Sequence, residues 1–328
     1  MKSVKMQDNF VRMGIEGPRN VNTTNFYGSY FLSEDEQFFS IKEFEENLKM
    51  KIIKNEENLL ILEIKNLNVS IANALRRIMI SEVPTVAIEK VNIYQNTGII
   101  ADEILCHRLG LIPFKINPDL INYKDEDESY NSFNCLCFKL HVKYNKKVGS
   151  NTNSQCVYSK ELIWVPLDEE QKKHFEKNIP KVVEDNILIT KLGSGQEIEL
   201  ICFLEKGIGK THAKWSPVCT AVYKMYPLFK FDVSKKLTNE EKKDLVNLCP
   251  KHVFDLEDSD KLVVKNPLKC SSCRACIEKY PSQVSFEKVK NHFIFTVEST
   301  GSITSVEIFR KALFILKNKI NDVKDVLE

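Results

Sequence analysis

The chain has 328 residues, of which 43% are hydrophobic and 28% charged, and 47 Lys and Arg face 45 Asp and Glu for a formal net charge of +2. This composition is typical of a soluble globular protein, and it lacks the cationic excess by which an autonomous nucleic-acid-binding protein neutralises phosphates. No stretch of about 18 apolar residues is present, and residues 1–8 hold no apolar segment, so we expect neither a membrane span nor a secretory signal and place the ten cysteines in a reducing compartment.

The N-terminal part divides into an irregular segment and a hairpin. Residues 1–39 show no clear periodicity, and we expect them to form an arm. Apolar residues then alternate on both sides of a turn at residues 55–58, with Met50 and Ile52 before it and Leu60 and Leu62 after it. Alternation of this kind predicts a β-hairpin.

Residues 69–83 change to a helical period. Their apolar residues recur three and four positions apart, which is the stripe of an amphipathic helix, and Pro84 ends it. The stripe consists of Ile71, Ala74, Leu75, Ile78 and Met79. Arg76 and Arg77 lie off the stripe, so they are either solvated or in contact with another protein.

A short helix is predicted over residues 102–110. Carboxylates occupy its first turn, where they suit the positive end of the helix dipole, and Gly110 suits its end. Cys106 and His107 lie side by side in this helix. A single Cys–His pair on a short helix more often has a structural role than a catalytic one. We expect no catalytic residue in the chain.

The sequence motif that indicates a chemical function most specifically is C-x2-C-x2-C. Cys270, Cys273 and Cys276 would place three thiolates around one centre, as iron–sulfur cubanes require, whereas zinc sites more often use two separated pairs. Tyr280 stands where a ferredoxin has its fourth cysteine, but Cys249 of an upstream Cys-Pro can supply the fourth ligand. We predict a [4Fe–4S] site with a structural or redox-sensitive role, and zinc or four metal-free thiols are the alternatives.

The C-terminal segment predicts a long helix with an unbroken heptad seam. Thr304 and Glu307 form a capping-box pattern at its start. From there apolar residues alternate at intervals of three and four, at Val306, Phe309, Leu313, Leu316, Ile320, Val323 and Leu327. Such a helix would be about 36 Å long. The helix at residues 69–83 is about half as long, so packing within the chain explains the first half of the seam better than the second. We expect the two helices to form a dimerisation face together.

Four segments in chain order resemble the signature of the alpha-like subunits of DNA-directed RNA polymerases. They are residues 73–85 (Asn-Ala-Leu-Arg-Arg-Ile-Met-Ile-Ser-Glu-Val-Pro-Thr), 99–113, 209–218 (Gly-Lys-Thr-His-Ala-Lys-Trp-Ser-Pro-Val) and 293–301. The resemblance covers about residues 40–325. Residues 89–91, 216–218 and 297–301 are most similar to the larger alpha-like subunit that eukaryotic RNA polymerases I and III share.

The resemblance implies an α+β fold, with an alpha-subunit-like dimerisation domain, an inserted β-rich domain and a ferredoxin-like insertion. The expected boundaries are residues 1–39 for the N-terminal arm, 40–97 plus 218–328 for the dimerisation domain, 98–217 for the insert domain and 236–283 for the ferredoxin-like segment.

The resemblance also implies a non-catalytic assembly subunit of RNA polymerases I and III, for transcription of rRNA, 5S rRNA and tRNA genes in the nucleus (nucleolus and nucleoplasm). Its partners would be a smaller alpha-like subunit and the two largest polymerase subunits, with no membrane and no direct sequence-specific nucleic-acid contact. The interface with the smaller subunit would use Ile71, Leu75, Ile78, Met79 and the seven seam residues. The residues implied to dock the large subunits are Arg76, Arg77, His107, Arg108, His212, Lys214 and Trp215.

Two other interpretations stay open at this point. One is a polymerase II or archaeal-type alpha-like subunit, since the archaeal subunit often keeps the cluster domain. The other, from a different class, is an iron–sulfur electron-transfer protein.

Overall fold

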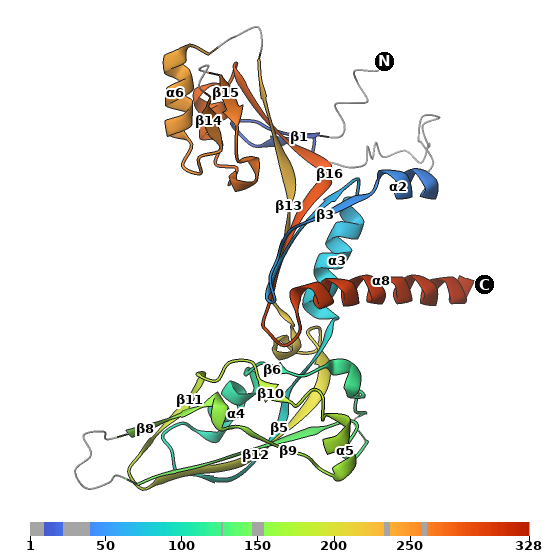
Figure 1. Cartoon of the computed structure of the whole chain (residues 1–328), viewed down its shortest axis with the longest axis vertical. Coiled ribbons are helices and arrows are strands. Elements are labelled where there is room, and N and C mark those ends of the chain that lie inside the picture. The colour runs from blue at the N-terminus through green and yellow to red at the C-terminus, as the bar shows by residue number, and fades with distance from the viewer. Residues whose placement is uncertain are drawn as a thin grey trace. The chain divides into compact units, whose positions relative to one another are not determined.

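The computed structural model describes residues 10–21, 40–125, 127–145, 154–232, 237–257 and 261–327. Helices and sheets alternate along the chain in a mixed α+β fold, as expected (Figure 1). The chain divides into two compact units, the first of Met1–Ile53, Ile61–Ala72 and Tyr223–Phe295, and the second of Lys54–Leu60, Asn73–Val222 and Thr296–Glu328. In the described ranges, every helix is too short or too polar to span a bilayer.

The largest sheet has six strands, in the order β2-β1-β16-β4-β3, with β13 also paired to β16. The strands are β1 (Phe10–Met13), β2 (Pro18–Arg19), β3 (Lys49–Asn55), β4 (Leu59–Lys65), β13 (Val218–Phe231) and β16 (Val284–Ser299). The predicted hairpin is confirmed, because β3 and β4 are neighbours and Glu56 and Leu59 exchange backbone hydrogen bonds of 2.9 and 3.3 Å at the turn. The short helix α2 (Ile41–Asn47) precedes this hairpin.

Part of the segment expected to be an arm joins this sheet. Phe10 lies opposite Val289 where β1 pairs antiparallel with β16, and β2 pairs with β1. The expectation for residues 1–9 and 22–39 falls outside the described residues.

Helix α3 (Val69–Ser81) follows the predicted period. The Asn68 side chain begins it by accepting a hydrogen bond of 2.8 Å from the Ser70 amide. Leu75, Ile78 and Met79 are at most 3% exposed, so the predicted stripe is the buried face of the helix. After α3 the chain enters the long strand β5 (Pro84–Asn96), since Pro84 suits the start of a strand better than the interior of a helix.

The second unit contains a four-stranded antiparallel sheet in the order β5-β12-β7-β9. Its other strands are β7 (Leu136–Tyr144), β9 (Ile163–Val165) and β12 (Gln196–Ile208). Alternate residues such as Phe138 and Leu200 point into one apolar core, where Leu105 and Leu109 of α4 (Asp102–Gly110) also lie. This unit also contains two small sheets and the short helix α5 (Glu169–His174). The sheets are β6 (Phe114–Lys115) with β10 (Lys181–Val182), and β8 (Ser154–Tyr158) with β11 (Leu188–Gly193).

A smaller core in the first unit organises the segment between β13 and β16. This segment comprises α6 (Asn239–Leu248), the paired strands β14 (Phe254–Leu256) and β15 (Leu262–Val264), and α7 (Ala275–Lys279). A capping box between Thr238 and Glu241 begins α6. Leu245, Phe254 and Ile277 pack together here, so the three elements share one apolar cluster.

The last helix, α8 (Ser305–Leu327), has the predicted length. The Thr304 hydroxyl accepts a hydrogen bond of 3.4 Å from the Glu307 amide, as the capping pattern predicts. The Glu307 carboxylate lies 3.7 Å from Arg310. Ser305, Ile308, Phe309 and Ala312 are buried, and all four lie in the first half of the helix.

Candidate partner-binding surfaces

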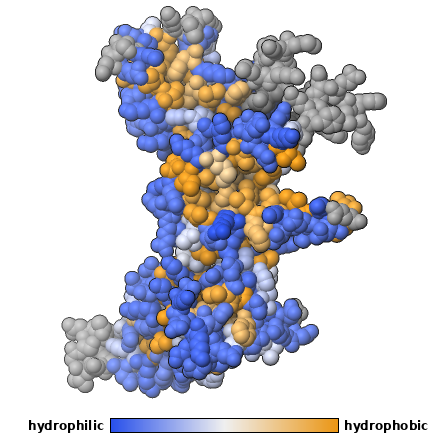
Figure 2. Space-filling model, turned by 45° about the vertical axis from the view of Figure 1, so that its right-hand side comes forward, coloured by the Kyte–Doolittle hydropathy of each residue, from blue (hydrophilic) through white to orange (hydrophobic). Residues whose placement is uncertain are grey.

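The second half of α8 exposes its apolar seam. In the first half, Phe309 is buried and Leu313 is 42% exposed; in the second half, Leu316 is half-buried and Ile320 and Val323 are each 60% exposed. Figure 1 shows this half extending away from the other elements of the second unit, and in Figure 2 hydrophobic residues lie along one side of the helix. An exposed apolar stripe on a regular helix is typical of a surface that another protein covers.

The α3 residues assigned to the same interface have a different environment. Leu75, Ile78 and Met79 are buried within the chain itself, whereas Ile71 is half-buried. These α3 residues can therefore stabilise an interface only by packing inside the chain, whereas α8 supplies the apolar surface that a partner can reach.

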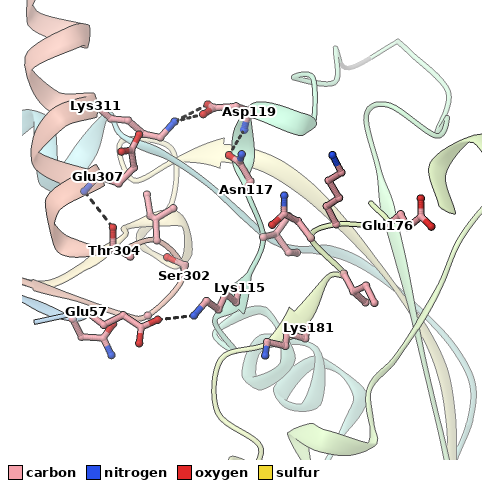
Figure 3. Close-up of a pocket in the computed structure, with 17 residues that line it drawn as sticks. Glu57, Lys115, Asn117, Asp119, Glu176, Lys181, Ser302, Thr304, Glu307 and Lys311 are labelled. Atoms are coloured by element: carbon pink, nitrogen blue, oxygen red, sulfur yellow. Dashed lines mark hydrogen bonds and ion pairs between the residues drawn. The ribbon is translucent and has the colours of Figure 1, made fainter. Parts of the chain in front are cut away.

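A charged hollow fixes the first turns of α8. Lys311 contacts both carboxylate oxygens of Asp119 at 2.6 Å, and Lys115 donates to Glu57 at 2.6 Å across the same hollow (Figure 3). The Lys115 hydrogen bond lowers the pKa of the Glu57 carboxyl, which keeps it ionised at neutral pH. Because these charges are paired, we interpret the hollow as a structural joint that orients α8.

The turn after β12 lies against the end of α3. A Cβ atom on Gly209 would lie 2.4 Å from the Ile80 carbonyl oxygen, so only glycine allows this close approach. The next amide, that of Lys210, donates to the Ser81 carbonyl at 2.7 Å. Lys210 is thereby placed beside α3.

The His212–Trp215 block continues from this turn and packs on β5 and β12. The indole N–H of Trp215 donates to the Glu205 carbonyl at 3.1 Å, and its own carbonyl accepts from the Thr85 hydroxyl at 2.7 Å. The ammonium group of Lys214 lies 4.4 Å from the centre of the Trp215 ring, donates to the Ile88 carbonyl and pairs with Glu89. The three implied docking residues of this block therefore lie together, with Trp215 buried and His212 exposed.

The arginines implied to dock large subunits lie in two places. Arg77 is exposed on α3, and Arg76 donates twice to the Asn73 side chain, at 3.0 and 3.1 Å. Arg108 donates to the Leu188 and Ile189 carbonyls from α4, which joins this helix to β11. His107 is exposed on the same helix.

The four predicted metal ligands converge on one cavity. Cys249, Cys270, Cys273 and Cys276 line it together with three phenylalanines. Ser272 and Arg274 have positive φ values of 62° and 70°, which wind the loop tightly between the cysteines. The Val253 and Ser272 amides point at the sulfurs of Cys249 and Cys270, at 3.4 and 3.3 Å. The cysteines that were grouped by their sequence spacing therefore line one cavity.

The protonation of the thiols, the volume of the cavity and the arrangement of the cysteines do not by themselves define a metal centre. Burial, with smaller contributions from the three neighbouring thiols, raises the pKa of Cys276 to about 11, so Cys276 is a neutral thiol at pH 7. The cavity measures about 20 Å³, room for about one water molecule. Within the described ranges, no group of three or more Cys, His, Asp or Glu side chains is arranged so that it could hold a metal ion. The donor chemistry of four thiols fits a thiolate-ligated centre.

Tyr280, which replaces the fourth ferredoxin cysteine, has a structural role. Its hydroxyl donates to the Asp244 carboxylate at 2.6 Å, and Lys279 contacts the same carboxylate at 2.8 Å. The hydrogen bond to Asp244 is the main cause that raises the pKa of Tyr280 to about 12. These contacts join α7 to α6.

Sequence reasoning did not single out Lys210, Glu82 and Lys319, which line one hollow together with Arg77 of α3. Lys210 lies inside the quoted 209–218 segment, but its closeness to α3 depends on the turn. Lys319 pairs with Glu82 at 2.6 Å, which joins the middle of α8 to the end of α3.

Residues 62–320 match the family described as the RNA polymerase Rpb3/Rpb11 dimerisation domain. The chain belongs to this family, and the resemblance to alpha-like polymerase subunits is confirmed.

Curated relatives are similar over nearly the whole chain. The DNA-directed RNA polymerases I and III subunit rpac1 of Dictyostelium discoideum is 43% identical and matches 94% of this chain and 90% of its own length. The subunit RPAC1 of the same two polymerases in Homo sapiens is 36% identical, over 97% of this chain and 95% of its own. The RNA polymerase II subunit rpb3 of Dictyostelium discoideum is 34% identical, and the match covers 84% of this chain and 93% of the length of rpb3.

Proposed function

We propose that this chain is a non-catalytic assembly subunit shared by RNA polymerases I and III, which pairs with a smaller alpha-like subunit and docks the two largest subunits. The observation that carries the proposal is the exposed second half of the α8 seam in a chain of the dimerisation family. Relatives that bear the name of the shared subunit of polymerases I and III support the choice of polymerase class. Such a subunit acts in the nucleus, in both the nucleolus and the nucleoplasm.

The pairing surface of the proposal consists of α8 supported by α3. The smaller subunit contacts the exposed seam residues Leu313, Ile320, Val323 and Leu327. The buried stripe of α3 packs inside the chain and stabilises the position of this surface. At roughly 1.5–3 kcal/mol for each large side chain buried, these four offer about 6–12 kcal/mol gross. The entropic costs of association and of side-chain ordering offset much of this free energy. A single charged substitution on the seam should therefore weaken binding of the smaller subunit strongly.

The docking surface for the large subunits comprises the cationic end of α3 and the His212–Trp215 block. Two features support this assignment: Arg77 and His212 are exposed, and the turn after β12 connects the two segments. Residues 40–97 and 218–328 serve as the dimerisation domain in this proposal, residues 98–217 as the insert domain and residues 1–39 as an arm.

Purification of the tagged chain from its native cells tests the function. We expect the two largest polymerase subunits and a small alpha-like protein in amounts equal to the chain, identified by mass spectrometry of the intact complex. Equal recovery is expected because an assembly subunit stays in the finished enzyme. Recovery of the chain alone, or with redox enzymes only, would contradict the proposal and favour an electron-transfer protein.

We also propose that residues 236–283 are a ferredoxin-like segment whose four cysteines hold a [4Fe–4S] cluster, with zinc or no metal as the alternatives. The shared cavity and the amides that point at two sulfurs support this proposal. The cluster would have a structural or redox-sensitive role, because four thiolates leave no open iron for a substrate.

Anaerobic purification tests the cluster. We expect a brown protein that absorbs near 400 nm and carries about four irons per chain, as thiolate-held cubanes do. Cys273→Ser should lose most of the colour because it removes one ligand, whereas Cys219→Ser, which changes a cysteine outside the cavity, should keep it. A colourless or zinc-loaded anaerobic preparation would show that the cluster assignment is wrong.

A further inference from the structure

A hairpin at residues 10–21 contacts the cysteine loop at residues 270–276, and both lie in the first unit. In this N-terminal hairpin, β2 folds back on β1 through a turn at residues 14–17 that a backbone hydrogen bond of 2.9 Å closes. The Arg274 guanidinium donates to the Ile15 carbonyl of this turn at 2.9 Å. Figure 1 shows β1 beside β16, near the end of the sheet where β14 and β15 lie. The turn of the hairpin therefore holds a residue of the cysteine loop.

Arg274 connects this contact to the geometry of the four cysteines. It lies between Cys273 and Cys276 in the chain and lines the cavity that they share. Its φ is 70°, a conformation that a residue with a side chain keeps only when its surroundings hold it. Its carbonyl accepts hydrogen bonds from the Ile277 and Glu278 amides, both at 3.0 Å, which begins α7. A change in the position of Arg274 would therefore move two of the cysteines and the start of α7.

The hairpin also contacts the apolar packing around the cysteines. Met13 of β1 is half-buried and packs on the small core of the first unit. Cys249, Cys270 and Cys276 pack on the same core. The hairpin thus has an apolar contact with this core and a polar contact with the loop. Displacement of the hairpin would remove both contacts together, so the positions of the hairpin and the loop depend on each other.

A separate set of charges anchors β1 to the large sheet. Arg12 lies 3.7 Å from the Glu287 carboxylate of β16, and Lys230 of β13 contacts the same carboxylate at 2.5 Å. The Lys230 ammonium group also lies 4.8 Å from the centre of the Phe10 ring. Glu287 is only 8% exposed, so a like charge beside it would be costly. This anchor lies outside the cysteine loop, and a substitution there can displace the hairpin without a change in the loop itself.

We infer that the N-terminal hairpin is a clasp that keeps the cysteine loop closed over its thiols. While the hairpin is docked, the loop shields Cys249, Cys270 and Cys276 from thiol-reactive molecules and from chelators of a bound metal. Release of the hairpin removes the hold on Arg274 and exposes these cysteines, whereas Cys273 is already exposed. The inference rests on the proposed cysteine site, but it does not depend on which metal occupies that site.

Thiol labelling of the full chain tests the inference. The reduced chain, freed of metal by a chelator, is treated with N-ethylmaleimide for set times, and the labelled peptides are measured by mass spectrometry. Arg274→Ala should speed the labelling of Cys249 and Cys276 at least about fivefold, because loss of the hydrogen bond to Ile15 lets the loop open more often. Cys202, which is buried in the second unit, should label as slowly as in the unaltered chain, which shows that this unit stays folded.

Arg12→Glu displaces the hairpin from its other side and leaves the cysteine loop unchanged. Arg12 lies directly opposite Glu287 where β1 pairs with β16, so the substitution places like charges across the two strands. It should therefore speed the labelling of Cys249 and Cys276 as well, by about threefold or more. The matched control Lys51→Glu reverses an exposed charge on β3 of the same unit and should label as the unaltered chain does.

Two outcomes overturn the inference. One is labelling of Arg274→Ala at the rate of the unaltered chain. The other is faster labelling of Arg274→Ala but not of Arg12→Glu, which would mean that the loop closes without the hairpin. A colourless anaerobic preparation contradicts the cluster proposal instead and leaves this test intact, because the labelling is measured on metal-free thiols.

Discussion

Ile320→Asp is expected to abolish pairing with the smaller alpha-like subunit while the chain itself stays folded. Ile320 is 60% exposed in the single chain, so the substitution should change the free energy of unfolding by less than about 0.5 kcal/mol. In the pair, the same side chain would be covered, and a carboxylate there loses apolar contact and is buried without a partner. We expect a loss of at least about 3 kcal/mol in binding, or about a hundredfold in Kd, measured by titration of the purified subunits.

Asn318→Asp is the matched control for this prediction. It adds the same charge to the same helix, but Asn318 lies two residues from Ile320 and therefore on the other side of α8. The control should pair normally. Normal pairing by Ile320→Asp would mean that the second half of the seam is not part of the interface.

Gly207→Ala is expected to destabilise the second unit by about 2–3 kcal/mol. A Cβ atom at Gly207 would lie 2.4 Å from two carbon atoms of the Trp215 ring, and this ring is 6% exposed, so it has little room to move. Displacement of the ring would also break the indole hydrogen bond to Glu205. Urea unfolding followed by tryptophan fluorescence measures the effect, because both tryptophans of the chain, Trp164 and Trp215, lie in the second unit.

Gly17→Ala serves as the control for this prediction. A Cβ atom at Gly17 meets no atom within 4 Å, and its φ is not in the left-handed region. Its midpoint of urea unfolding should match that of the unaltered chain. An unchanged midpoint for Gly207→Ala would show that the Trp215 block shifts freely and is not a rigid part of the docking surface.

Periodicity in the sequence predicted the elements that carry the site. The heptad intervals of α8 and the stripe of α3 both correspond to real helices, because the spacing of apolar residues reflects the 3.6-residue turn directly. The cysteine spacing likewise brought Cys249 together with the loop at residues 270–276. Each of these inferences depends on neighbours that are close in the chain or on a motif of fixed spacing.

Exposure could not be predicted in the same way. Met79 and Ile320 both belong to apolar stripes, yet one is fully buried and the other is 60% exposed. The hollow that Arg77, Lys210 and Lys319 line together could not be predicted either, because each of these residues lies more than a hundred positions from the next in the chain. The Gly209 turn that places Lys210 has no periodic pattern.

By itself, the sequence determined the helices α3, α4 and α8, the hairpin, the grouping of the cysteines and membership in the polymerase family, because local spacing and motif order record them. Only the tertiary structure decided that Leu75, Ile78 and Met79 of the α3 stripe are buried within the chain itself, and that Lys319 pairs with Glu82. Burial and charge pairing depend on the distance between side chains in space, and the chain order of Glu82 and Lys319 does not contain that distance.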